Sequence, residues 1–259
     1  MSGSSTNEGF HISPPSCLGR TVLLGYCDVA AAGLRALEGL SPQSAGGGLQ
    51  EVGRENLRVN GAKELFTGIP LLEVVHFEGG DSKEPLPLSL MKLNFDVGQE
   101  LGTPMALALV ELFAKHFDAL ELDKVVIAAG VQAPRRSQRK PASDAQPPPD
   151  TVCTVASGCE LPSALAGLPS LPKATRLSDT FLTMLVRLFQ IEERPMVVLA
   201  KDSYRVAADS PADDGTDQAI EGLGMSLASA FGLEFNMEGS ARLRRQKKAT
   251  ATLGIPGYI

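Results

Sequence analysis

The sequence predicts an α/β fold in which a central, mainly buried sheet lies between helices. Short apolar runs typical of buried strands are followed by longer segments that carry apolar residues at helical spacing. Stretches rich in proline, glycine and polar residues separate these segments. With 259 residues, of which 43% are hydrophobic, the chain is long enough to bury a large core. We therefore expect one α/β domain with disordered inserts and a flexible C-terminal tail.

The first third of the chain predicts a strand, a helix and then a pair of strands. Residues 21–26 are an apolar run of strand formers, and the small-residue stretch 29–37 has helical spacing. Residues 41–53 contain three consecutive glycines and have little to bury, so they are expected to form a loop. The apolar runs 71–77 and 88–95 are separated by glycines and prolines, which favours an antiparallel pair.

The middle of the chain predicts its clearest helix and a buried strand. Thr103 offers a capping hydroxyl and Pro104 suits a first turn, so the helix is expected to run from Thr103 to about Leu120. Residues 124–129 then form an apolar run that ends at Gly130. A helix that returns to a strand is typical of sheets with covered faces. The apolar stripe of the helix comprises Met105, Leu109, Leu112, Phe113 and Phe117.

The last third predicts two further helices around a strand. Residues 134–150 are basic, polar and proline-rich, which indicates a disordered insert. A strand candidate at 152–155 precedes a helix that begins with Asp179 in a capping position. The apolar run 196–200 is the next strand, and a final helix spans about 217–231.

Composition limits the class of partner and the compartment. The formal net charge of −6 gives no reason to expect nucleic acid as the main partner, because phosphate binding needs a basic face. No apolar run approaches the about 20 residues that cross a bilayer, and the first residues lack a signal-peptide pattern, so no membrane partner and a cytoplasmic location are expected. The four cysteines form no C-x-x-C pair, which predicts reduced thiols without a disulfide framework or a zinc site.

Catalytic motifs are incomplete in this sequence. It contains no G-x-S-x-G elbow, no phosphate-binding loop and no H-E-x-x-H helix. His76 and His116 lie within a predicted strand and a predicted helix, where structural roles are commoner. The glycines at 222–224 begin a dinucleotide fingerprint without completing it, and close helix packing explains them better. We therefore expect no catalytic residue, no cofactor and no metal.

Asp28 supports an alternative function, that of an enzyme. It follows the first strand, where it either caps the next helix or acts as a catalytic carboxylate at a strand end. The capping interpretation is favoured. The alternative function is a small-molecule enzyme on a phosphorylase-like or hydrolase-like scaffold, with its site near Asp28 and Gly130.

The C-terminal residues 237–259 predict a docking tail. They lack apolar periodicity and contain a basic cluster at 242–248, which is a solvated tether or, alternatively, a nucleic-acid or nuclear-import signal. Apolar and aromatic residues follow the cluster. An aromatic ring buries a large area at low entropic cost, and a terminal carboxylate can pair with a basic side chain in a pocket. The predicted docking residues are Ile255, Pro256, Gly257, Tyr258 and Ile259.

The order of these segments resembles the proteasome assembly chaperone 1 family. The resemblance rests on residues 21–37, 71–95 and 103–130, on the helix start Asp179-Thr180-Phe181-Leu182, and on the proline-led strand within 191–199. It implies an α/β sandwich without a catalytic role. It also implies a heterodimer with a second, related chaperone that caps the α-subunit ring of the 20S core particle during assembly, in the cytoplasm and also the nucleus.

The resemblance further implies that the C-terminal tail docks between proteasome α subunits. The family pattern ends in a hydrophobic residue, a tyrosine and then any residue. Tyr258 and Ile259 fit this pattern, whereas Gly257 departs from it and Ile255 and Pro256 offer apolar contact nearby. The expected organisation is a disordered N-terminus at 1–16, one chaperone domain at 17–236 with the insert at about 134–150, and the docking tail at 237–259.

Overall fold

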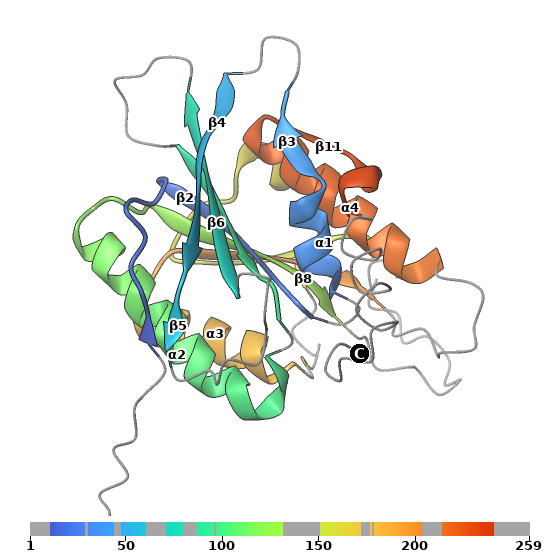
Figure 1. Cartoon of the computed structure of the whole chain (residues 1–259). Helices are drawn as coiled ribbons and strands as arrows, with labels where there is room; N and C mark the ends of the chain where they lie inside the picture. Colours follow the sequence, from blue (N-terminus) through green and yellow to red (C-terminus); the bar gives the residue numbers. More distant parts are fainter. Residues whose placement is uncertain are drawn as a thin grey trace, which may run out of the picture.

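A seven-stranded mixed sheet organises the chain (Figure 1). The structure, a computed structural model, describes residues 11–28, 31–43, 48–60, 71–79, 87–95, 97–131, 151–171, 177, 179–203 and 214–240. Helices cover both faces of the sheet, which confirms the predicted α/β class. In spatial order the strands are β4 (Leu49–Leu57), β6 (Leu72–Gly79), β7 (Leu88–Leu93), β2 (Thr21–Tyr26), β8 (Lys124–Val131), β10 (Met196–Asp202) and β9 (Cys153–Ser157).

The four central strands, β7, β2, β8 and β10, are parallel to one another. The strands at the two sides are antiparallel to their neighbours, with β6 on β7, β4 on β6 and β9 on β10. In the β6–β7 pair, Val75 lies opposite Leu90 and Leu72 opposite Leu93. The predicted antiparallel pair is therefore confirmed. Every residue of β2 and β7 is buried, as continuous apolar runs covered on both faces should be.

Side chains that alternate along the strands build two cores. α2 (Gly98–Asp118) and α3 (Thr180–Ile191) lie on one face of the sheet, and α1 (Ala32–Glu38) and α4 (Asp214–Phe231) lie on the other (Figure 1). Val22 and Leu24 of β2 point into the core under α2 and α3, whereas Leu23 points into the other core. The predicted strands and helices around both cores are confirmed, including the strand at 196–200 and the helix that ends at Phe231.

α2 begins earlier than the sequence predicts. It starts at Gly98, so Thr103 is not its cap and Pro104 lies inside the helix. The added turn packs against the start of α3: a Cβ on Gly102 would lie 3.2 Å from the backbone nitrogen of Phe181. This contact joins residues far apart in the sequence, so local sequence patterns do not predict it. The predicted apolar stripe is buried along its whole length.

The predicted loop at 41–53 is wrong in part, because two strands occupy most of its described residues. β3 (Leu40–Pro42) pairs with β11 (Leu233–Phe235), and β4 forms the edge of the main sheet next to β6. Most side chains of β4 are exposed or only half-buried. An edge strand of this kind is held by backbone hydrogen bonds to its neighbour, and its sequence shows little apolar alternation.

Segments at both ends of the predicted domain also belong to the fold. β1 (His11–Ile12) pairs with β5 (Val59–Asn60), which places residues 11–16, expected to be disordered, beside the sheet. Residues 237–240, expected in the tail, form a short helical turn after β11. The single turn η2 (Ser163–Leu165) follows β9. The insert at 134–150 lies outside the described residues. Within the part of the chain that the structure describes, no helix is both long and apolar enough to cross a membrane.

Candidate functional site

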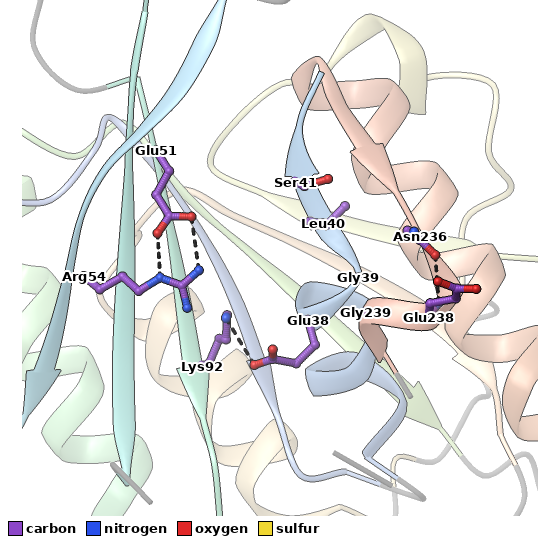
Figure 2. Close-up of a pocket in the computed structure, with 10 residues that line it drawn as sticks. All are labelled: Glu38, Gly39, Leu40, Ser41, Glu51, Arg54, Lys92, Asn236, Glu238 and Gly239. Atoms are coloured by element: carbon purple, nitrogen blue, oxygen red, sulfur yellow. Dashed lines mark hydrogen bonds and ion pairs between the residues drawn. The ribbon is translucent and has the colours of Figure 1, made fainter. Parts of the chain in front are cut away.

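A polar cavity of about 570 Å³ lies where edge strand β4 and strand β7 face the end of α1. Figure 2 shows charged side chains that point into it from the sheet and from α1. The wall opposite the sheet is formed by β3 and by the turn after β11 (Figure 2). The lining residues are Glu38, Gly39, Leu40, Ser41, Glu51, Arg54, Lys92, Asn236, Glu238 and Gly239.

Lys92 is the buried cation of this cavity, with 4% of its surface exposed. Its Nζ lies 3.1 Å from Oε1 of Glu38 and 3.4 Å from Oε2 of Glu73. Glu73 faces Lys92 directly across the β6–β7 pair, whereas Glu38 reaches it from the end of α1. A buried ammonium is costly without a partner, and two carboxylates offset that cost. The pairing also fixes α1 against the sheet.

Arg54 completes the ionic network. Its guanidinium makes a bidentate contact with Glu51, at 2.5 and 3.1 Å, and a third contact with Glu73 at 3.2 Å. The hydrogen bonds from Arg54 lower the pKa of Glu51, and the same bonds raise the pKa of Arg54. Both cations are therefore neutralised by carboxylates of the chain, so the cavity is better suited to a cationic or neutral group than to an anion.

The sequence contains one signal for this network. Lys92 is the one charged residue of the buried strand β7, and a buried lysine is almost always paired. The sequence does not indicate which carboxylates pair with Lys92, because Glu38 and Glu73 belong to other elements.

Asp28 lies at the carboxyl end of β2. Its Oδ2 accepts hydrogen bonds from the backbone N–H of Gly33, at 2.9 Å, and from that of Gly130. Gly33 is in the first turn of α1, so the side chain of Asp28 binds this turn as the capping interpretation expects, but the N-cap position is occupied by Ala31 and not by Asp28. The structure thus brings Asp28 and Gly130 together, as the enzyme alternative required. Asp28 is 7% exposed, and its Oδ2 is engaged by two backbone groups that join α1 to β8.

Asp28 is expected to make stability depend on pH. Burial raises its pKa well above the ordinary value, more than the backbone hydrogen bonds from Gly130, Gly33 and Ala32 lower it. Between the ordinary and the raised pKa, the folded state keeps a proton that the unfolded state has lost. The free energy of unfolding therefore falls as pH rises through this window, by at most about 1.4 kcal/mol per pH unit.

The variant Asp28→Asn removes this titration and keeps an oxygen acceptor for the two N–H groups. We expect its stability relative to wild type to increase as pH rises from about 4 towards neutrality, starting near the ordinary pKa of a carboxyl group. Urea unfolding of both proteins across this pH range measures the difference in their free energies of unfolding. The acid end of the range is the internal control, because Asp28 is protonated there in both the folded and the unfolded state. A difference that stays constant with pH would contradict the expectation.

The start of α3 is fixed to the same end of β2. The hydroxyl of Tyr26 donates to Oδ2 of Asp179 at 2.8 Å, and Oδ1 of Asp179 accepts from the N–H of Leu182 at 2.9 Å. The predicted cap at Asp179 is therefore confirmed. The ring of Tyr26 also contacts Phe181, with ring centroids 4.8 Å apart. Burial, assisted by the nearby carboxylate of Asp179, raises the pKa of Tyr26 well above its ordinary value.

His116 and the glycines at 222–224, which the sequence singles out, make contacts within the fold. Nδ1 of His116 lies 2.8 Å from Glu121 at the end of α2. The close packing predicted for 222–224 is confirmed, because a Cβ on Gly224 would lie 2.2 Å from the ring of Phe235. Ile255, Pro256, Gly257, Tyr258 and Ile259, like the basic cluster at 242–248, lie outside the described residues.

The described polar clusters serve mainly to hold elements together, and the fold defines a three-layer α/β protein with a mixed sheet. No family model matches the sequence, and no curated protein matches it significantly. Solved structures do share the fold. PbaA of Pyrococcus furiosus, an archaeal homolog of proteasome-assembly chaperone, is 14% identical with a TM-score of 0.52, covering 93% of this chain and 94% of that one.

Two further structures have the same fold. PbaB of Pyrococcus furiosus, an archaeal proteasome activator, is 13% identical with a TM-score of 0.52, and the match covers 95% of this chain and 99% of that one. A protein of unknown function from Thermoplasma acidophilum is 12% identical with a TM-score of 0.54, covering 90% and 86%. The predicted resemblance to proteasome assembly chaperones is confirmed at the level of the fold.

Proposed function

We propose that this chain is a proteasome-assembly chaperone. The observation that carries the proposal is the fold shared with PbaA over 93% of the chain. The order of segments in the sequence independently resembles the same family. The polar cluster around Lys92 supports a binding protein over an enzyme, because Lys92 and Arg54 are engaged in contacts between elements of the chain itself.

The proposal has a finer part, which concerns partners. The folded domain pairs with a second, related chaperone, and the heterodimer caps the α-subunit ring of the 20S core particle. The tail inserts Tyr258 between α subunits, with Ile255 and Pro256 as apolar neighbours and the terminal carboxylate against a basic side chain. The heterodimer acts in the cytoplasm and the nucleus.

Removal of Gly257, Tyr258 and Ile259 is expected to weaken binding to proteasome α subunits and to leave binding to the related chaperone unchanged. Loss of a buried aromatic anchor typically costs at least about 2 kcal/mol, which is about 30-fold in affinity. Affinity capture from cell extract with the intact and the shortened chain, followed by mass spectrometry, compares the two classes of partner.

Single substitutions of Tyr258 refine this experiment. Tyr258→Ala should reproduce the effect of the truncation, whereas Tyr258→Phe keeps the ring and should retain most of the α-subunit binding. Equal recovery of α subunits with intact and shortened chains would contradict tail docking. Recovery of neither a related chaperone nor α subunits with the intact chain would contradict the assembly-chaperone proposal itself.

A further inference from the structure

Three side chains of different chemistry meet at the edge of the sheet. Cys17 precedes β2, Glu55 lies on β4 and His76 lies on β6. The Sγ of Cys17, a carboxylate oxygen of Glu55 and a ring nitrogen of His76 all lie within 4.8 Å of one another. This cluster is separate from the cavity around Lys92, because His76 shares its face of the sheet with Val74, in the core under α2 and α3.

Strand pairing sets the positions of His76 and Glu55 on the sheet. His76 lies opposite Gly53 on β4, and Glu55 is two residues further along that strand, so both side chains are on one face. The N–H of Ser16 donates to Oε2 of Glu55 at 2.9 Å, and the hydroxyl of Ser16 donates to Oε1. These bonds hold the segment before β2 against β4 and bring Cys17 beside the carboxylate.

His76 is held in the way that metal-binding histidines usually are. It is 3% exposed, and its Nδ1 lies 3.0 Å from the hydroxyl oxygen of Ser89, which faces it across the β6–β7 pair. The same oxygen accepts the N–H of Gly19 at 2.9 Å. A hydrogen-bond partner at one ring nitrogen fixes the ring and leaves the other nitrogen for a metal. That other nitrogen, Nε2, makes a direct polar contact with Oε1 of Glu55 at 3.1 Å, which an ion bound between the two atoms would replace.

The separation of Nε2 and Oε1 and the set of donor atoms suit zinc. Nitrogen and oxygen ligands of a tetrahedral zinc, at bond lengths of 2.0–2.2 Å, lie about 3.3 Å apart, close to the separation of Nε2 and Oε1. Thiolate, imidazole and carboxylate are all zinc ligands. We propose that Cys17, Glu55 and His76 bind a zinc ion, with water in the fourth position.

The protonation of the site balances the charge of the ion. The thiol of Cys17 loses its proton to solvent when the metal binds, and thiolate and carboxylate together supply two negative charges. Binding of the ion at Nε2 requires the ring proton of His76 to be on Nδ1, which lies 3.0 Å from the hydroxyl oxygen of Ser89. The ion would tie the segment before β2 to β4 and β6. The sequence could not reveal this site, because its ligands come from three separate segments and lack the spacing of a zinc motif.

Cobalt and zinc titrations of the full chain test the proposal, after treatment with a chelator under reducing conditions. Zinc is expected to bind with one equivalent in calorimetry, and cobalt(II) at the same site is expected to give a thiolate-to-cobalt charge-transfer band. Since loss of an outer-shell partner typically costs about 10–100-fold in metal affinity, Ser89→Ala should lose that much, and Cys17→Ser, which removes a ligand, at least about 100-fold.

Two matched controls identify the site. His116→Gln removes the other described pair of a histidine with a carboxylate, which has no cysteine beside it in the described structure, and Cys159→Ser removes a partly buried thiol elsewhere. Both should bind metal as wild type does. Thermal unfolding without metal establishes that Cys17→Ser is folded, and zinc should raise the Tm of wild type and His116→Gln but not that of Cys17→Ser. Absence of the charge-transfer band from wild type, or its persistence in Cys17→Ser, would overturn the proposal.

Discussion

Replacing Phe113 with alanine is expected to lower the free energy of unfolding by about 3–5 kcal/mol. Phe113 is fully buried on α2, where its ring centroid lies 6.0 Å from that of Phe189 on α3. Phe189 also contacts Phe117 one turn further along α2, with centroids 6.3 Å apart. The two helices are held together by this aromatic contact, so the substitution removes buried area and leaves a cavity that rigid neighbours cannot close.

Leu107→Ala is the matched control for this experiment. Leu107 lies on the same helix with 51% of its surface exposed, so its truncation should change stability by about 0.5 kcal/mol or less. Urea denaturation followed by circular dichroism gives both values, and the slope of the transition verifies that each variant unfolds cooperatively. Similar losses for the two variants would contradict the packing of α2 on α3 described above.

Gly33→Ala is expected to be destabilising by about 3 kcal/mol, at the upper end of the usual cost of overpacking. A Cβ at this position would lie 2.0 Å from the carbonyl oxygen of Ala128. That oxygen belongs to the backbone of β8, which pairs with β2 on one side and β10 on the other. Strand β8 cannot move without breaking its hydrogen bonds to these two neighbours. The helix α1 would therefore have to shift outward, which would weaken the hydrogen bond from Gly33 to Asp28.

Gly167→Ala controls for the general effect of adding a methyl group at a glycine. A Cβ there would meet nothing within 4 Å, so stability should stay within about 0.5 kcal/mol of wild type. Thermal unfolding of the three proteins, followed by circular dichroism, compares the two glycines under identical conditions. If Gly33→Ala were as stable as Gly167→Ala, the close approach of α1 to β8 would be disproved.

Much of the fold could be predicted from the sequence because its central elements have strong local patterns. The continuous apolar runs of β2, β7, β8 and β10 indicate strands that are covered on both faces. The stripe on α2 indicates a helix that packs on one side, and Asp179 indicates where α3 begins. The edge strand β4 was missed because its pairing with β6 comes from backbone hydrogen bonds, and these leave almost no trace in the side chains.

The sequence by itself determined the class of fold, the central strands and the apolar faces of the helices, since each depends on the spacing of neighbouring residues. Only the tertiary structure decided which polar residues meet. Lys92 finds Glu38 at the end of α1, and Cys17 lies beside Glu55 and His76, although all of them come from separate segments. Such contacts depend on strand order, register and helix packing, which bring distant residues within a few ångströms and therefore cannot be inferred from local spacing.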